Sequence, residues 1–410
     1  MIKRMTFKQF LFIIPLLVLI GVFALYPIVT STMYGFFNYR TNNQQTNGFY
    51  LKHYFNANLF AENLKYVNYY LSADVQYFDE ESAAAAAALM DQNTKYMDQY
   101  VDQGTNITIS TETTSELEQY VADMQQQVAG WYSAAGEIEY SNQENLDIIM
   151  GDLGTSFIKS NFVGGANYQK LVTDSRFYAA LQHTLVFTTI SVVLEFILGM
   201  AMALILDKAI RGIGVIRTAS LLPWAIPTAV SAMIWRYLYD GSYGIVAKLF
   251  ADIGITSSQA SMMLTSTGAM SAAIIADVWK TTPYMMLLLL AGLQTIDRGV
   301  YESAAIDGSG KVRTFFRITL PLMKSSIMVA LLFRTLDAFR IYDLIALLTG
   351  GGPANSTETL SVYAYQIMFG QSNYGYGSAI VIGMFVCVAV IAVVFVKLLG
   401  ADVVGNPESR

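Results

Sequence analysis

Residues 302–321, ESAAIDGSGKVRTFFRITLP, contain the letters GSGK, which raise the possibility of a nucleotide-binding loop. A common phosphate-binding loop has a glycine five residues before its Gly-Lys pair and Ser or Thr directly after the lysine, because backbone amides wrap the phosphates and the hydroxyl binds Mg²⁺. Here Ala305 and Val312 occupy those two positions. The upstream residues from Tyr284, YMMLLLLAGL, predict the end of an apolar helix and not the strand that precedes such a loop. We therefore expect no nucleotide site, and the role of the stretch depends on where it lies.

The composition indicates a membrane protein. Of the 410 residues, 54% are apolar and 14% are charged, whereas roughly a quarter of the residues in soluble domains are charged. The single cysteine, Cys387, lies in an apolar run, which excludes an internal disulfide framework and a cysteine metal cluster. His53 and His183 are too far apart in sequence to form a local metal motif.

Six stretches are long enough to cross a membrane, which takes about 20 mainly apolar residues. The first follows Lys3, Arg4 and Lys8, a charge pattern that suits a signal peptide. Its apolar run is too long for one and lacks a clear cleavage site, so we expect an uncleaved anchor. The six ranges are 10–37, 178–206, 214–238, 267–293, 325–349 and 378–399.

The orientation of the spans follows from the short basic segments, because Lys and Arg near span ends tend to stay in the cytoplasm. A cytoplasmic N-terminus places the basic residues of two loops inside as well: Lys208, Arg211, Arg217, Arg298, Lys311, Arg313, Arg317 and Lys324. The loop 239–266, whose only basic residue is Lys248, then lies outside. We expect both termini and residues 294–324 to be cytoplasmic.

The segment 41–160 has a different character. It holds 17 acidic and 4 basic residues, whereas the rest of the chain holds 14 acidic and 21 basic residues. It has no proline, and its aromatic residues return at three- and four-residue intervals among helix formers. The six alanines 83–88 fit a helix interior. We predict a mainly helical, acidic insert outside the membrane, between the first and second spans.

The loop 294–324 predicts a helical elbow on the inner face of the membrane. Residues 297–307 can form one short helix with Asp297 as N-cap, and Lys311 to Thr319 a second. Gly308 between them allows a left-handed backbone. Such an elbow suits a helix-in-groove contact, with Glu302 as a charged anchor, alanines for close packing, and Arg313 and Arg317 as a basic face. The alternative is a solvated loop that its arginines hold near anionic headgroups.

This stretch resembles the EAA loop of permease subunits in ATP-binding-cassette (ABC) importers. The matching residues are Glu302, Ser303, Ala304, Gly308, Ile318, Leu320 and Pro321. Ser303 stands where the family more often has alanine. The resemblance implies that the residues coupling this chain to a separate ATPase are Glu302, Ser303, Ala304, Ala305, Asp307, Gly308 and Arg313.

Four further stretches resemble the carbohydrate, MalF-like branch of that family. They are NFVGGANYQKLV from 161, LLPWAIPTAVSAMIWRYLYDGSYG from 221, DVWKTTPYMMLLLLAGLQTI from 277 and FRTLDAFRIYDLIALLTGGGPANSTETL from 333. The resemblance implies an all-α membrane protein with six transmembrane helices of the ABC importer permease fold. We expect a tail and first span in 1–40, the insert in 41–160, a core with five spans and the coupling loop in 161–400, and a cytoplasmic tail in 401–410. MalF carries a mainly β insertion that helps to engage a sugar-binding protein, so a helical insert leaves that role, a spacer and a lipoprotein contact all open.

Charged residues inside a span are costly and usually face a protein interior or a water-filled cavity. The fifth span has Arg334, Asp337, Arg340 and Asp343, each three residues from the next with alternating sign, so that neighbours can pair along the helix. The structural explanation is internal pairing, and the functional one is a polar route for a hydroxyl-rich solute. Resemblance to MalF carries over these pathway residues: Asp277, Thr281, Tyr284, Asp337, Ala338, Arg340 and Ile341. Glu195 in the second span is expected to pair with a basic residue.

The resemblance implies a permease subunit of an ATP-driven, binding-protein-dependent importer of a disaccharide such as trehalose or maltose, in a bacterial or archaeal cytoplasmic membrane. It implies a second permease subunit, two ATPase subunits that use ATP and Mg, and an extracytoplasmic binding protein or lipoprotein. We expect no enzyme activity, cofactor, metal or nucleic acid for this chain. The alternatives are an ion-coupled secondary transporter, a membrane enzyme, and a receptor that uses the insert as its sensor.

Overall fold

The computed structural model describes residues 7–43, 45–105, 107–136, 138, 141–208 and 212–403. Lys3, Arg4 and Arg211, which contributed to the predicted orientation, lie outside these residues, as does most of the tail 401–410. The described chain falls into two compact units. One holds the residues up to Tyr168 together with Ser372–Tyr376, and the other holds Gln169–Gln371 with the residues from Gly377 onward.

The first unit begins with a membrane-length helix. It consists of α1 (Phe7–Ile20), a π-helical turn at Gly21–Leu25 and α2 (Tyr26–Gly35). Within it, Ile13–Gly35 is long and apolar enough to cross a membrane. Its apolar side chains remain largely exposed in the chain, which suits a surface that faces lipid.

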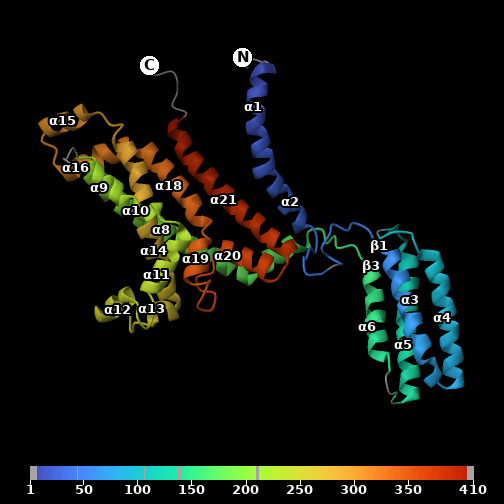
Figure 1. Ribbon diagram of the computed structural model, residues 1–410. Coiled ribbons are helices and arrows are strands. Elements are labelled where there is room, and N and C mark those ends of the chain that lie inside the picture. Colours follow the sequence, from blue (N-terminus) through green and yellow to red (C-terminus); the bar gives the residue numbers. More distant parts are fainter. Residues whose placement is uncertain are drawn as a thin grey trace. The chain divides into compact units, whose positions relative to one another are not determined.

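The insert is a bundle of four helices, α3 (Ala57–Asp74), α4 (Glu80–Tyr100), α5 (Thr111–Ala135) and α6 (Gln143–Leu153), which lie side by side (Figure 1). Two single 3-10 turns, Val75–Tyr77 and Gly154–Ser156, follow α3 and α6. Asn56, Asp79 and Ser110 cap the first three helices, each accepting a backbone N–H with its side chain. The buried core includes Phe60, Leu64, Leu71, Met124, Val128, Leu146 and Met150. The insert is therefore mainly helical, as its sequence indicates.

A small antiparallel sheet closes one end of this bundle and was not predicted. It is formed by β1 (Tyr54–Phe55), β2 (Ile107–Thr108) and β3 (Phe157–Ile158), in the order β2-β1-β3. Buried Phe55 and Phe157 stack with ring centroids 5.3 Å apart. Strands of two residues show no alternating pattern, so the sequence contains no signal for them.

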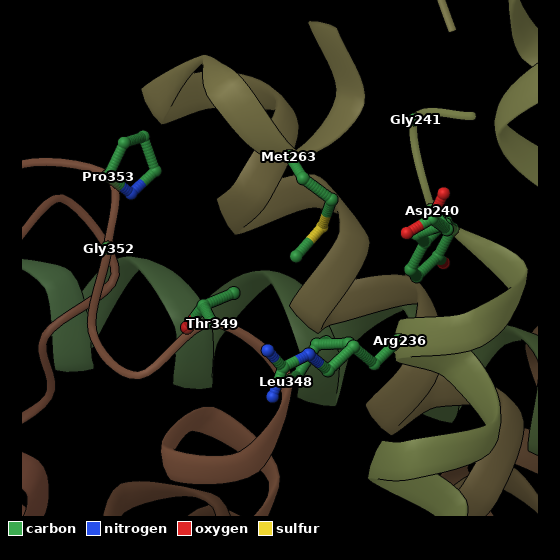
Figure 2. Close-up of a pocket in the computed structure, with 9 residues that line it drawn as sticks. Arg236, Asp240, Gly241, Met263, Leu348, Thr349, Gly352 and Pro353 are labelled. Atoms are coloured by element: carbon green, nitrogen blue, oxygen red, sulfur yellow. The ribbon is translucent and has the colours of Figure 1, made fainter. Parts of the chain in front are cut away.

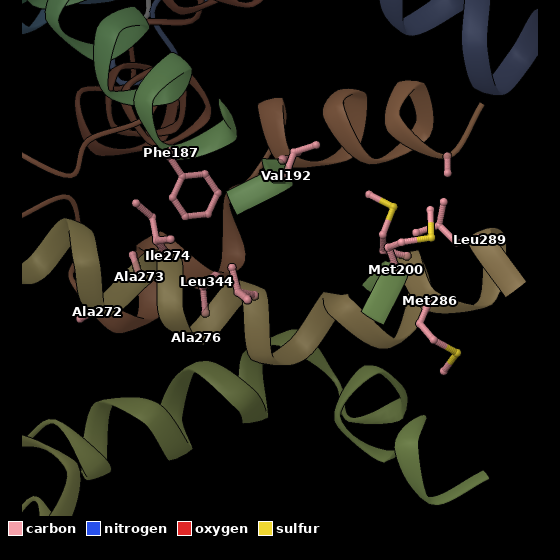
Figure 3. Packing of buried hydrophobic residues seen from close by; sticks show 14 of the residues in the cluster. Phe187, Val192, Met200, Ala272, Ala273, Ile274, Ala276, Met286, Leu289 and Leu344 are labelled. Carbon is pink, nitrogen blue, oxygen red and sulfur yellow. The ribbon is translucent and has the colours of Figure 1, made fainter. Parts of the chain in front are cut away.

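The second unit is built around α8 (Ser175–Leu206), α14 (Ser266–Leu293) and α18 (Lys324–Phe339). Their buried side chains form one apolar cluster, in which Phe187 of α8 faces Ile274 of α14 (Figure 3). The backbones approach closely at Gly199, where an added Cβ would lie 3.1 Å from the backbone nitrogen of Met286. Small residues let helices in a membrane pack at such short range.

The third predicted span is bent, which its sequence range did not indicate. The third span comprises α9 (Ile213–Ser220), α10 (Leu222–Ala225) and α11 (Thr228–Leu238), and it bends by 85° between Ala225 and Thr228. Pro227 explains the break, because proline lacks an N–H and forces the preceding residue out of the helical region. Ile226 is accordingly extended, with ψ 133°.

The fifth span differs from the predicted range 325–349. A 71° bend separates Lys311–Leu322 from α18, which then ends at Phe339. The chain turns at residues 340–342 before α19 (Asp343–Leu348). In the described residues, four helices are long and apolar enough to cross a membrane, and the number rises to six if each bent pair forms one span.

The remaining helices are shorter, except for the last span. They are α7 (Ala166–Thr173), α12 (Ile245–Asp252), α13 (Ser261–Leu264), α15 (Arg298–Ile306), α16 (Lys311–Thr314), a π-helical turn at Phe315–Thr319, α17 (Leu320–Leu322), α20 (Leu360–Tyr365), a second π-helical turn at Gln366–Gly370, and α21 (Tyr374–Val403).

Candidate functional site

The predicted elbow is present. Asp297 caps α15 by accepting the N–H of Gly299 at 2.6 Å, and Gly308 then adopts a left-handed backbone with φ 72°. The N–H groups of Gly308 and Ser309 donate to the carbonyls of Ala305 and Ala304, which closes the helix end. The change of direction at Gly308 is therefore a local property of the backbone.

The residues predicted to couple the elbow to a partner are mostly exposed. Ala304 is buried, whereas the other six are on the surface: Glu302, Ser303, Ala305, Asp307, Gly308 and Arg313. Two neighbours that the sequence reasoning passed over are large and apolar, with exposed fractions of 87% for Ile306 and 72% for Val312. Apolar side chains presented beside charged ones are typical of a protein contact surface.

The elbow is connected to the spans through its base. A cavity of about 600 Å³ lies there, lined by residues of the end of α8, including Leu204 and Ile205, and of the elbow, including Tyr301 and Phe315. The Tyr301 hydroxyl lies 3.3 Å from Thr319 Oγ1. The elbow therefore shares the lining of this cavity with the end of α8.

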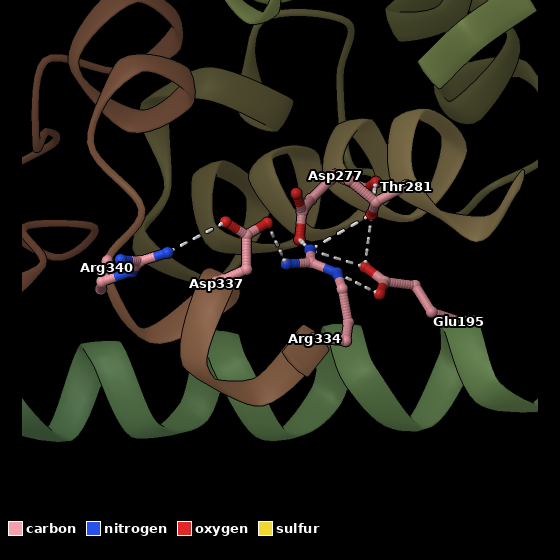
Figure 4. Close-up of polar contacts among 6 residues, drawn as sticks. All are labelled: Glu195, Asp277, Thr281, Arg334, Asp337 and Arg340. Carbon is pink, nitrogen blue, oxygen red and sulfur yellow. Dashed lines mark hydrogen bonds and ion pairs between the residues drawn. The ribbon is translucent and has the colours of Figure 1, made fainter. Parts of the chain in front are cut away.

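A buried ion cluster joins three helices of the second unit (Figure 4). Arg334 of α18, with an exposed fraction of 1%, binds both oxygens of Glu195 from α8 and one oxygen of Asp277 from α14. Thr281 donates its hydroxyl to Glu195 Oε1 at 2.7 Å. The expected ion pair of Glu195 is confirmed, and the cluster joins three helices that lie far apart in sequence.

The cluster opens toward solvent along α18. Arg334 Nη1 lies 3.2 Å from Asp337 Oδ2, and Arg340 Nη2 lies 3.7 Å from Asp337 Oδ1. These two pairs are spaced three residues apart, as predicted. The helix ends before Asp343, so the pairing along one helix does not continue to that residue. The side chains of Asp337 and Arg340 are 61% exposed.

A cavity of about 360 Å³ lies beside the exposed end of the cluster. It is lined by Thr228, Asp277, Lys280, Thr281, Asp337, Arg340, Ile341, Tyr342 and Asp343. Five of the seven predicted pathway residues therefore meet there: Asp277, Thr281, Asp337, Arg340 and Ile341. Its remaining lining includes Thr228 and Tyr342, which the sequence reasoning missed because they belong to the two chain breaks.

The other two predicted pathway residues lie elsewhere. Tyr284 stacks on Trp224 of α10, with ring centroids 5.5 Å apart and an interplanar angle of 14°. Ala338 is fully buried in the apolar cluster. Lys280, one turn before Tyr284, donates to the carbonyl oxygens of Ile226 at 2.8 Å and Trp224 at 3.3 Å.

A third cavity, of about 330 Å³, lies at the end of α11 (Figure 2). Figure 2 shows Arg236 and Asp240 on one side, Met263 of α13 above, and the chain from Thr349 to Pro353 on the other side. Asp240 Oδ1 accepts the backbone N–H groups of Ser242 and Tyr243, and the bond from Ser242 is the main cause that lowers the pKa of Asp240. The sequence reasoning did not single out this polar cavity.

Residues 195–404 match the family model described as the inner membrane component of binding-protein-dependent transport systems. That range includes the ion cluster, the three cavities and the elbow. The chain belongs to this family. It is thus a multi-pass permease subunit of the inner membrane, a transport subunit without a catalytic domain, and no cofactor is expected in it.

Curated relatives agree with this assignment. The permease is 44% identical over 237 residues to the trehalose/maltose transport system permease protein MalF of Thermococcus litoralis, covering 58% of this chain and 79% of that protein. It is 42% identical over 248 residues to the trehalose transport system permease protein SugA of Mycobacterium tuberculosis, covering 60% and 78%. A sulfoquinovosyl glycerol permease, SmoG of Agrobacterium fabrum, is 35% identical, with 60% and 79% covered.

Solved structures show the same fold. The permease resembles a chain of a bacterial ABC transporter that imports the polysaccharide alginate, with a TM-score of 0.53 and 22% identity, covering 59% of this permease and 85% of that chain. A second structure, of a bacterial alginate ABC transporter in complex with an alginate-bound periplasmic protein, gives a TM-score of 0.52 and 19% identity, with 70% and 96% covered. The predicted all-α permease fold is confirmed. The insert 41–160 lies outside the range that the family model matches.

Proposed function

We propose that this permease subunit imports a sugar, and that the sugar is a glucose-containing disaccharide such as trehalose or maltose. The observation that carries the proposal is the identity of 44% and 42% to permeases named for trehalose or maltose transport. These identities are clearly higher than the 35% shared with the relative named for sulfoquinovosyl glycerol.

The chemistry of the 360 Å³ cavity supports a neutral, hydroxyl-rich solute. Its lining presents carboxylates, a guanidinium and hydroxyl groups, which together can donate and accept hydrogen bonds from many directions. The lining charges nearly balance, with Lys280 and Arg340 opposite Asp277, Asp337 and Asp343, and Asp277 is already paired with Arg334. A cavity of this kind favours hydrogen bonding over binding of a net charge.

We further propose that the elbow at residues 294–324 docks on a separate ATPase subunit. Glu302, Asp307 and Arg313 would supply the charged contacts, and exposed Ile306 and Val312 would supply the apolar ones. ATP-driven closure of two ATPase subunits, which bind Mg and ATP, would then move the elbow and bias the spans between two arrangements. A second permease subunit would complete the pathway, of which this chain forms half.

The insert would face an extracytoplasmic binding protein or lipoprotein. The segment 41–160 holds 17 acidic and 4 basic residues, and this charge suits a partner with a basic face. A spacer without a partner is the competing possibility, and excision of the insert separates the two.

Transport by the reconstituted complex tests the proposed function. The chain is purified with the subunits that accompany it, placed in liposomes with ATP inside, and supplied with its binding protein loaded with labelled trehalose or maltose. Uptake should require both ATP and the binding protein. Uptake that continues without an ATPase subunit, driven by an ion gradient, would refute the proposal and favour a secondary transporter.

Two substitutions test which residues line the sugar pathway and which couple it to ATP hydrolysis. Asp337→Ala should change the KM for sugar with assembly intact, whereas Asp252→Ala, an exposed position outside the cavity, serves as the matched control.

Glu302→Lys should leave assembly in the membrane intact but separate ATP hydrolysis from uptake. Normal coupling in this variant would show that the elbow does not link ATP hydrolysis to uptake.

A further inference from the structure

The break of the third span leaves backbone carbonyl groups without helical partners. The helix α10 ends at Ala225, Ile226 is extended, and Pro227 provides no N–H. The carbonyls of Trp224 and Ile226 therefore find no N–H group four residues further along the chain. In the interior of a bilayer a carbonyl without a donor is costly, and non-helical backbone persists only where the protein satisfies it.

Lys280 supplies the missing donors. Its Nζ donates to Ile226 O at 2.8 Å and to Trp224 O at 3.3 Å, and its exposed fraction is 7%. One turn further along α14, the ring of Tyr284 stacks on the ring of Trp224. Two consecutive turns of α14 therefore hold the end of α10.

Lys280 is not engaged as an ion-pair partner of the nearby cluster. Asp277, three residues earlier on α14, binds Arg334 instead. Within the part of the chain that the structure describes, the hydrogen-bond partners of Lys280 Nζ are the two carbonyl groups at the break. Its N–H donors thus satisfy the backbone of the third span.

The geometry points to Lys280 as a positioning residue that holds the break of the third span against α14 and so sets one wall of the transport cavity. Thr228, the first residue of α11 after the break, lines the same cavity as Lys280 and Asp337. If the break moved, Thr228 would move with it. This role rests on the proposed function for its effect on transport but not for its effect on the backbone.

Hydrogen exchange of the complete transporter in lipid nanodiscs tests the backbone role directly. In Lys280→Met the amides of residues 222–231 should exchange about tenfold faster or more, because local opening becomes easier. Lys280→Arg keeps the donors and should restore slow exchange. Lys248→Met, at an exposed position in α12, should match the wild type.

Transport kinetics give the second readout. In Lys280→Met the maximal uptake rate should fall about tenfold with KM changed less than about twofold, and Lys280→Arg should recover most of the rate. If Lys280→Met does not assemble, Lys280→Gln replaces it, since glutamine keeps one donor group on a shorter side chain. This variant must also show faster amide exchange at residues 222–231 and a lower maximal uptake rate.

Two results would overturn the inference. The first is a rate of amide exchange at residues 222–231 that is unchanged in Lys280→Met. The second is a rate in Lys280→Arg that is as fast as the rate in Lys280→Met. Failure of the wild-type complex to import sugar would count against the proposed function alone. The exchange comparison does not depend on which solute is carried.

Discussion

Arg334 shows how much one side chain can organise in a membrane protein. Its guanidinium binds carboxylates of Glu195 and Asp277 from two other helices, and all three groups are almost fully buried. A buried charge is tolerated only with partners, and removing one partner leaves the others uncompensated. The sequence predicted the pairs between neighbours along α18, but it did not indicate that Arg334 meets Glu195 and Asp277.

Arg334→Met should destabilise the permease by about 3–5 kcal/mol, because it leaves two carboxylates buried without a cation. Arg340→Met, whose side chain is 61% exposed, should cost far less. The melting temperature of the detergent-purified complex, followed by size-exclusion chromatography, measures the difference. Adding Glu195→Gln and Asp277→Asn to Arg334→Met should recover part of the loss. No recovery would show that packing of the arginine, and not its charge, stabilises the cluster.

In the insert, Asp79 is an exposed carboxylate that caps a helix. Ser82 donates its backbone N–H to Asp79 Oδ1 at 2.7 Å, and this bond lowers the pKa of the Asp79 carboxyl. A carboxyl with a lowered folded pKa stabilises the folded state above its unfolded pKa of about 4, and the contribution is lost as the pH falls through the lower folded value.

At acid pH the insert should lose the small part of its stability that the Asp79 carboxylate provides. Asp79→Asn should therefore lose less stability than the wild type when the pH falls. Asparagine still caps a helix but does not titrate in this range. The melting temperature of the insert, followed by the fluorescence of Trp131 in a chain whose other tryptophans are phenylalanine, is compared at pH 6 and pH 3, which bracket the unfolded pKa of about 4. The same drop in melting temperature with and without the Asp79→Asn substitution would contradict the assignment.

At the scale of elements, single residues determine the turns between helices. The elbow depends on Gly308, whose φ of 72° an L-residue adopts only with strain. Gly310, two residues later, has φ −70° and ψ 156°, which any residue adopts. The two glycines form a matched pair inside one loop.

Gly308→Ala should weaken the turn by about 1–2 kcal/mol, whereas Gly310→Ala should be neutral or slightly stabilising. If the elbow couples the permease to an ATPase, Gly308→Ala should lower binding-protein-stimulated ATP hydrolysis several-fold more than Gly310→Ala does. Both rates are measured on complexes of equal subunit content. Equal rates in the two variants would mean that the shape of the turn is not important for coupling.

For the whole molecule, the two ends of the insert lie next to each other in the structure. The N–H of Asn161 donates to Tyr50 O at 3.1 Å, and the N–H of Tyr50 donates to Asn161 Oδ1 at 3.0 Å. The two ends of the insert therefore meet, and a short linker can join them. The helical bundle has its own buried core, separate from the core of α8 and α14.

Replacing residues 52–159 by a short Gly-Ser linker should leave membrane insertion and subunit assembly intact. If the insert engages the binding protein, the stimulation of ATP hydrolysis by that protein should fall about tenfold, a loss of about 1.4 kcal/mol of coupling. Basal hydrolysis should not change. Full stimulation after excision would identify the insert as a spacer.

The sequence by itself determined the local features of this permease: the apolar lengths of the spans, the helical character of the insert, the cap at Asp297 and the turn at Gly308. These depend on the period of apolar residues and on backbone preferences, which act over a few residues. Only the tertiary structure decided that Arg334 meets Glu195, 139 residues away, that Lys280 holds the break at Ile226, and that Tyr284 lies outside the cavity. Such contacts depend on which helices pack together. The spacing of residues along the chain does not give the distances between helices, so it cannot tell which of several charged side chains will pair.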